Sequence, residues 1–293
     1  MTARELARDH EQSAVRWFAG LAGDLDGDFH HRPPVVLLHG LTFDRGIWGP
    51  VRAELSKVDA GRPVLALDLP GHGRSPAWTS YDLERVTDVV HRAVEEAQLR
   101  SPVVVGHSMA AVVATIYASK YPASGVVNVD QWLQVGPIAQ LLRSVAAQIR
   151  GPGFPAVWEM FEASMHVELL PASARDLIHA TCHPSQELVT GYWRELLDEP
   201  LAELAARAST GLAALAASKV PYLFIAGHEL EPEYERWLNE RLPQARVTVW
   251  PDSGHFPHLA EPRRFAECLA ATARWPSGLP GLELGRLEGR SWQ

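Results

Sequence analysis

Six short apolar runs constrain the fold of this 293-residue chain more than any other feature of its sequence. Runs of this kind, rich in Val, Leu and Ile, are typical of strands that are buried on both faces. Segments with a helical or nearly all-apolar pattern, at 86–97 and 109–121, lie between some of them. This alternation predicts an α/β fold with a mostly parallel, doubly wound sheet that is covered by helices on both sides. The runs are residues 34–40, 63–68, 102–107, 125–130, 221–227 and 245–250.

The alternation is interrupted at residues 131–218, where no strand-like run occurs and Pro and Gly separate several helical segments. Such an insertion covers the C-terminal edge of the sheet, where open α/β sheets bind ligands. We therefore predict a core of residues 1–130 and 219–293 with an inserted helical cap, or lid, at 131–218. The expected cap helices lie near residues 138–150, 154–165, 172–181, 186–197 and 201–217.

The two ends of the chain carry weaker signals. Residues around 15–21 are expected to add one or two edge strands, and the Gly- and Pro-rich tail after residue 275 to be loosely held. The first twenty residues are charged throughout and have no apolar signal-peptide core, and no run is long enough for a membrane span. The expected location is therefore the cytoplasm.

Composition argues against several classes of function. A formal net charge of −8 disfavours a protein that binds nucleic acid, which would usually carry a basic face. The two cysteines, Cys182 and Cys268, can form no disulfide framework and lack metal-ligand spacing. A dinucleotide-binding glycine fingerprint is missing as well. We expect neither a metal nor a cofactor, and the sequence leaves the oligomeric state open.

The segment Gly106-His107-Ser108-Met109-Ala110 follows a Val-rich run and precedes an apolar helix. A serine on such a strand-to-helix turn projects its hydroxyl above the sheet, at the positive end of the helix. Gly106 leaves room for the turn, although Ala110 stands where such motifs usually have Gly. The alternative interpretation is a serine that only caps the helix. We take Ser108 as the candidate nucleophile.

Four motifs in order resemble those of the α/β-hydrolase superfamily, and the resemblance covers roughly residues 34–272. They are His39-Gly40-Leu41, the segment 68–75 (DLPGHGRS), the segment 106–110 and the segment 253–257 (SGHFP). The resemblance implies that His255 is the general base. It also implies an oxyanion hole formed by the main-chain N–H groups of Leu41 and Met109.

The other histidines near these motifs are expected to be structural. His39 and His72 belong to glycine-containing turns and should shape them by hydrogen bonds. His107 neighbours the serine, but its side chain should point elsewhere. His258 is expected at the surface near a helix start, and His166 in a buried or interfacial position within the cap.

The acid that would orient His255 departs from the superfamily's usual pattern. The superfamily usually places it after the seventh strand as Gly-x-x-Asp, and Leu230 stands at that position here. Some members place it after the strand that is sixth in the superfamily's own count. The resemblance equates that strand with residues 125–130 of this chain, which end in Asp130. We therefore favour Asp130 over Glu229 and Glu231.

Four tryptophans are candidates for substrate binding. Trp132, Trp158 and Trp193 lie in the predicted cap, and Trp48 follows the expected oxyanion loop. Core packing is the alternative role for each of them. Together they indicate an apolar cavity and a small, apolar substrate.

The leading hypothesis is a serine hydrolase that cleaves a carboxylic ester, lactones and thioesters included, through an acyl-enzyme on Ser108. Acyl transfer and hydrolysis of a carbon–carbon bond use the same residues and stay open. A second hypothesis is a cofactor-free oxygenase of the same fold, which would use His255 with Asp130. A third, a non-catalytic receptor, is disfavoured by the intact Ser–His pair.

Overall fold

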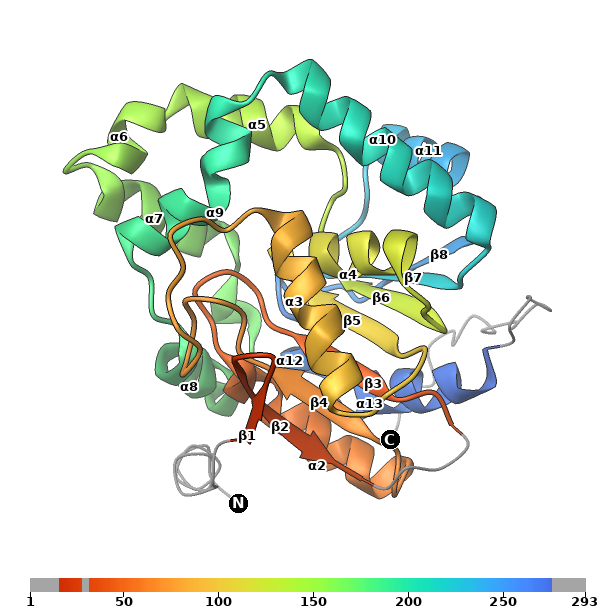
Figure 1. Ribbon diagram of the computed structural model, residues 1–293. Helices are drawn as coiled ribbons and strands as arrows, with labels where there is room; N and C mark the ends of the chain where they lie inside the picture. Colours follow the sequence, from red (N-terminus) through yellow and green to blue (C-terminus); the bar gives the residue numbers. More distant parts are fainter. Residues whose placement is uncertain (1–15, 28–31, 276–293) are drawn as a thin grey trace.

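The computed structural model describes residues 16–27 and 32–275, which form an eight-stranded sheet flanked by helices (Figure 1). The strand order is β1-β2-β4-β3-β5-β6-β7-β8, and β3 to β8 all run parallel. The predicted fold class is confirmed. The strands are β1 (Arg16–Phe18), β2 (Leu21–Asp26), β3 (Val35–Leu38), β4 (Val64–Leu67), β5 (Val103–His107), β6 (Gly125–Val129), β7 (Tyr222–Ala226) and β8 (Ala245–Val249).

The six apolar runs form β3 to β8, and every residue of β3 to β7 is buried. Successive residues face opposite layers, as the alternation of side chains along a strand requires. Val36 and Leu38 belong to one hydrophobic cluster, whereas Val35 and Leu37 belong to the other. Helices α3 (Leu83–Glu96), α4 (Met109–Lys120) and α11 (Pro232–Arg241) contribute to the first cluster, and α2 (Gly49–Val58) and α13 (Pro262–Ala271) to the second.

The two edge strands expected near residues 15–21 are present as the antiparallel pair β1–β2, although β2 extends to Asp26. Ala19 and Gly20 join them, both with positive φ (51° and 81°), which suits the tight turn of a right-twisted hairpin. The tail after Trp275 lies outside the described residues.

Helices fill the chain between β6 and β7, as the strand-free interval predicted. They are α5 (Val135–Ser144), α6 (Ala146–Arg150), α7 (Phe154–Ser164), η2 (Val167–Leu169), α8 (Ala172–Thr181), α9 (Gln186–Asp198) and α10 (Leu201–Ser218). One expectation was wrong, because residues 138–150 form two helices rather than one. The break falls at Val145 (φ −116°, ψ 18°), whose N–H donates to the Leu142 carbonyl, one residue short of the α-helical spacing.

These helices do not pack as one separate layer. Helices α5 and α10 lie above α4 in Figure 1, and Leu142 and Leu212 share a hydrophobic cluster with Val113 of α4. Helix α8 instead packs with the opposite side of the sheet, where Leu177 joins the cluster that contains Trp48. The remaining short elements are η1 (Arg45–Trp48), α12 (Pro257–Ala260) and η3 (Thr272–Arg274).

Candidate active site

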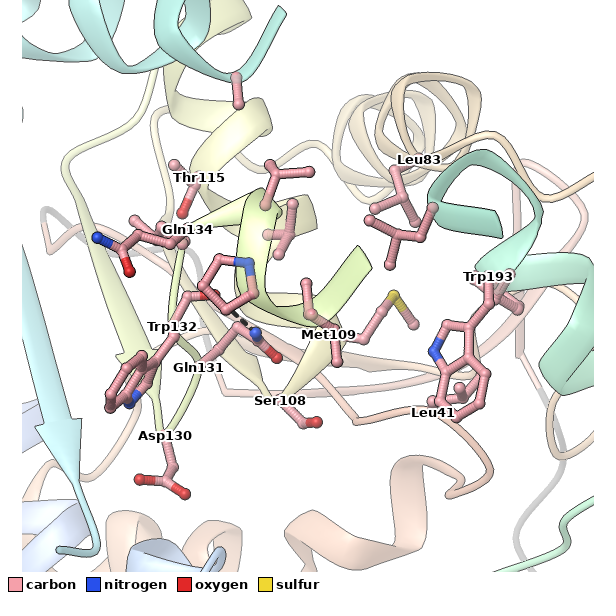
Figure 2. Close-up of a pocket in the computed structure, with 18 of the residues that line it drawn as sticks. Leu41, Leu83, Ser108, Met109, Thr115, Asp130, Gln131, Trp132, Gln134 and Trp193 are labelled. Carbon is pink, nitrogen blue, oxygen red and sulfur yellow. Dashed lines mark hydrogen bonds between the residues drawn. The ribbon is translucent and has the colours of Figure 1, made fainter. Parts of the chain in front are cut away.

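Ser108 occupies a strained turn between β5 and α4. Its backbone has φ 53° and ψ −136°, and its side chain makes no capping hydrogen bond to the helix, so the capping interpretation is wrong. The turn needs Gly106, because a Cβ there would lie 2.2 Å from the Ala110 carbonyl oxygen. Strained residues of this kind cluster at functional sites. The hydroxyl lines a cavity, with Asp130 and Trp132 on one side of Ser108 and Leu41 and Trp193 on the other (Figure 2).

Asp130 follows β6 directly and adopts a positive φ of 55°, which turns its carboxylate toward the end of β7. Its Oδ1 accepts the Gly227 N–H at 2.9 Å, and its Oδ2 lies 2.7 Å from His255 Nδ1. This is the hydrogen bond expected from the sequence. A carboxylate in this position accepts Nδ1–H and leaves Nε2 of the imidazole free to accept a proton.

Two opposing effects act on the pKa of Asp130. Burial raises it, but the hydrogen bond and charge of His255, the Gly227 N–H and the charge of His228 together lower it below its usual value. The carboxylate therefore stays ionised at neutral pH. His228 Nδ1 lies 3.7 Å from Oδ1, a neighbour that sequence analysis did not anticipate.

The competing acids lie elsewhere. Glu229 and Glu231 are exposed, and Glu231 stands at the start of α11. Leu230, at the usual acid position, is buried in the hydrophobic core. Of these candidates, Asp130 is the one the fold brings to His255.

The main chain of His255 is held from two directions. Its N–H donates to the Met165 carbonyl at 2.9 Å, and its carbonyl accepts Nε2–H of His107 at 2.8 Å. Gly254, at φ 52°, lets the two segments meet, because a Cβ there would lie 2.7 Å from the Met165 carbonyl oxygen. The role of Met165 carried no sequence signal, since it comes from a segment remote in the chain.

The loop after β3 approaches Ser108 closely. A Cβ on Gly40 would lie 3.1 Å from Ser108 Cβ. Within residues 16–27 and 32–275, the N–H groups of Leu41 and Met109 donate to no other protein group, and both residues line the cavity. Two free donors beside a strained serine are what an oxyanion hole requires.

Two buried histidines fix that loop, as predicted. His39 Nε2 accepts the Leu69 N–H at 2.9 Å, and His72 Nε2 accepts the Thr42 N–H at 3.1 Å. Their Nδ1 atoms lie 2.8 Å and 3.0 Å from carbonyl oxygens and carry the donated protons. The neutral imidazoles therefore tie the loop after β3 to the loop after β4.

The expected surface position of His258 was wrong. Its side chain is fully buried, 4.5 Å from Trp48 between ring centroids, and neither ring nitrogen has a hydrogen-bond partner among the residues that the structure describes. The short helix α12 turns the ring inward against Phe265 rather than toward solvent. His166 also differs from expectation, because its side chain is 60% exposed and pairs with Glu168 at 3.0 Å.

Four buried histidines near the site resist protonation because they are shielded from water. Burial lowers the pKa of His39 to about 4 and the pKa values of His72 and His258 to about 3, and it lowers the pKa of His107 well below its usual value. The unfolded chain, with histidine pKa values near about 6.5, binds more protons than the folded chain below that pH. The free energy of unfolding is therefore at its full value above about pH 6.5. It falls as the pH drops from there toward the pKa values of the folded chain.

We expect acid unfolding to begin at mildly acidic pH. His39, His72 and His258 together should remove about 6 kcal/mol by pH 5, a loss comparable with the whole stability of many domains. Urea titrations between pH 7.5 and 5 would measure it. His258→Phe, which keeps an aromatic ring beside Trp48, should lose about 2 kcal/mol less stability than the wild type between pH 7.5 and 5 and so reduce the slope over that range by about a third. An unchanged slope in this variant would contradict proton uptake by His258.

A large cavity connects these groups. It has a volume of about 1580 Å³ and is lined by Ser108, Asp130 and His255. Its walls include the three tryptophans predicted for the cap, Trp132, Trp158 and Trp193. Trp132 stacks on Tyr234 with ring centroids 4.5 Å apart, whereas Trp158 and Trp193 are almost fully buried.

The prediction that Trp48 contacts substrate was wrong. The indole is fully buried, lies outside the cavity lining and packs against His258 and Phe265. The η1 turn begins with Asp44, whose side chain accepts the Gly46 N–H, and it directs the indole to the opposite side of the sheet from α4. Trp48 therefore supports the core beneath His258.

Replacing Gly254 by Ala is expected to lower both the stability of the protein and kcat. The loss of kcat should be greater than in a control variant that loses the same stability. The positive φ should cost about 1–2 kcal/mol for any residue with a Cβ. At Gly254 the methyl group would also collide with the Met165 carbonyl and displace His255. Gly61→Ala is the matched control, since Gly61 has φ 78° and open space around its Cβ position. Equal stability losses with equal kcat values would contradict a positioning role for Gly254.

In the part of the chain that the structure describes, none of the helices is long and apolar enough to cross a membrane. Within residues 16–27 and 32–275, no group of three or more His, Cys, Asp and Glu side chains is arranged to hold a metal ion.

Comparison with known proteins identifies the family. The sequence profile of the alpha/beta hydrolase family matches residues 35–268, so the chain belongs to that family. A pimeloyl-[acyl-carrier protein] methyl ester esterase of Chromobacterium violaceum is 28% identical over 254 residues, which are 81% of this chain and 93% of that protein.

Solved structures share the fold. The enol-lactonase of Burkholderia xenovorans LB400 is similar with a TM-score of 0.68 at 23% identity, over 88% of this chain and 99% of that one. AqDC, described as recognising and ring-cleaving the Pseudomonas quinolone signal, has a TM-score of 0.71 at 13% identity, over 89% and 99% of the two chains. At such identities the likeness establishes the fold alone.

Proposed function

We propose that the protein is a serine hydrolase that cleaves carboxylic esters through an acyl-enzyme on Ser108. One observation carries the proposal: Ser108 and the hydrogen-bonded pair Asp130–His255 border the same cavity. The relative named as a methyl ester esterase supports an ester-like substrate, since its name describes cleavage of such a bond.

In the proposed reaction, Ser108 Oγ attacks the ester carbonyl carbon while His255 Nε2 accepts the hydroxyl proton. The negative charge that develops on the carbonyl oxygen is stabilised by the N–H groups of Leu41 and Met109. The carbon–oxygen bond to the alcohol then breaks, and His255 donates its proton to the departing oxygen. Water, deprotonated by the same imidazole, hydrolyses the acyl-enzyme and restores Ser108.

Asp130 has two tasks in this mechanism. It fixes the tautomer with the proton on Nδ1, so that Nε2 faces the serine, and it stabilises the imidazolium that forms during attack. Helices α5, α7, α9 and α10 act as the cap, since their residues line the cavity above Ser108.

Covalent labelling tests the proposal directly. A fluorophosphonate probe should add one label per chain, on the peptide that contains Ser108, and 4-nitrophenyl acetate should be hydrolysed. Prior incubation with the probe should abolish hydrolysis in proportion to labelling. Labelling of another residue, or hydrolysis that survives complete labelling, would refute the assignment of Ser108.

A second candidate is a cofactor-free oxygenase that uses His255 with Asp130. The position of the acid after β6 favours it, and the ring-cleaving AqDC shares the fold. Oxygen consumption in the presence of a 3-hydroxy-4-quinolone, measured with an oxygen electrode, separates the two functions. Oxygen uptake that persists after labelling of Ser108 would establish the oxygenase.

A further inference from the structure

Helix α4 leaves one stripe uncovered along its length. Its residues are mostly buried, but Met109, Val112, Ile116 and Ser119 are only half-buried, and all four line the cavity. Their spacing of three and four residues places them on one face of the helix. At a rise of 1.5 Å per residue, this stripe extends about 16 Å from Ser108 to Ser119. The cavity therefore continues far beyond the serine.

Small residues of α10 form part of the wall opposite this stripe, beside Leu204, Arg207 and Leu212 of the same helix. Ala208, Gly211 and Ala214 recur every three residues and all line the cavity. A Cβ on Gly211 would lie 3.7 Å from Ser119 Oγ, an ordinary van der Waals contact, so α10 and α4 approach each other closely at this depth. Leu141 of α5 borders the same space and is 43% exposed.

The far end of this space is polar, but its cations are already paired. Lys120 Nζ lies 2.7 Å from Asp88 Oδ1, and Arg207 lies 2.7 Å from Glu199 and 3.1 Å from Glu195. Among the described residues that line this end of the cavity, both cations therefore already have a carboxylate partner, so a carboxylate at the end of a bound chain would have to compete for them. The space suits an apolar chain that ends near a polar rim.

The mechanism decides which part of an ester occupies this space. His255 must reach the departing oxygen to protonate it, so the alcohol lies on the His255 side of Ser108. That side of the cavity is bordered by Met165, His166 and Asp252. The acyl substituent extends the other way, along α4.

We propose, on the basis of the serine hydrolase function above, that the substrate carries an unbranched aliphatic acyl chain bound along α4. The channel along Val112 and Ile116 receives the chain, and the close approach of Gly211 to Ser119 ends the channel and sets its maximum length. A channel of about 16 Å holds an extended chain on the order of a dozen carbons. Burial of each methylene should raise kcat/KM about four-fold until the channel is full.

Obstructions at graded depths test this proposal. Val112→Phe, Ile116→Phe and Gly211→Leu place bulk about 6, 12 and 16 Å from Ser108. With 4-nitrophenyl esters from acetate to hexadecanoate, the preferred chain length should be shortest in Val112→Phe and longest in Gly211→Leu. The ratio of kcat/KM for dodecanoate to that for acetate should fall at least 100-fold in Ile116→Phe. Ala213→Leu, on an exposed position of α10 outside the cavity lining, should keep the wild-type profile.

The outcomes separate this inference from the proposed function. Acetate hydrolysis with a flat chain-length profile, or variants that share the wild-type profile, would overturn the channel alone. If the variants instead lower the hydrolysis of esters with long alcohols, the alcohol rather than the acyl chain would lie along α4, and the proposed orientation of the substrate would be overturned. If the wild-type protein hydrolyses no ester, the proposed function fails, and calorimetric titration with dodecanoate then tests the channel. Binding to the wild type that is lost in Ile116→Phe supports the channel. Equal binding to the wild type and to Ile116→Phe, or no detectable binding to either, overturns it.

Discussion

Replacing Ser108 by Ala is expected to lower kcat about 10⁶-fold, the size of the loss when a serine protease loses its nucleophile. The variant cannot form the acyl-enzyme, so only the oxyanion-hole donors and substrate binding remain to accelerate direct attack by water. Because the Ser108 side chain caps no helix N–H, its removal should leave thermal unfolding nearly unchanged. Initial rates with 4-nitrophenyl esters, followed over several hours, would resolve the residual activity.

The matched control is Ser144→Ala, at an exposed position on α5 outside the cavity lining. It should retain wild-type kcat and should still be labelled by a fluorophosphonate, whereas Ser108→Ala should not be labelled. More than a tenth of wild-type turnover in Ser108→Ala would show that another residue or a bound water performs the attack.

Replacing Asp130 by Asn is expected to lower kcat about 10⁴-fold. The amide can still accept the Gly227 N–H, but it would donate a proton toward His255 Nδ1 and so stabilise the wrong tautomer. Nε2 would then carry a proton and could not accept one from Ser108. Near-UV circular dichroism and thermal unfolding should show a folded protein, since the substitution keeps the shape of the side chain.

Glu229→Gln and Glu231→Gln are the matched controls, because both carboxylates are exposed and Asp130 holds the hydrogen bond to His255. Each should keep kcat within about two-fold, in line with the small effects of surface substitutions. A greater loss in either control than in Asp130→Asn would move the acid to the loop after β7.

The sequence alone located the parallel strands of the sheet and the order in which they follow one another along the chain. Apolar runs that lack alternation are stable only when both faces are covered, so the segments that became β3 to β8 could be located without tertiary information. The turn around Ser108 and the Asp130 position could be located for the same reason, because each follows directly from the end of such a run. Strand ends of a parallel sheet meet at one edge, which places Ser108 and Asp130 near each other before any contact is known.

The tertiary structure decided what depends on segments distant in the chain. His258 looked like a surface residue because its neighbours are Pro257 and a helix start, yet η1 and α13 close over it. The direction of Trp48 is likewise set by its packing partners rather than by the loop that carries it. The main-chain bond from His255 to Met165 joins residues 90 positions apart, and no local pattern encodes it.

The channel along α4 shows the same division. The sequence marks α4 as apolar all round and therefore as buried, which is correct for most of its residues. Which stripe stays uncovered depends on how α10 crosses above it and on the small side chains that α10 presents there. Local propensity and burial pattern are properties of single segments, whereas a cavity is the space left between segments, and only their packing defines it.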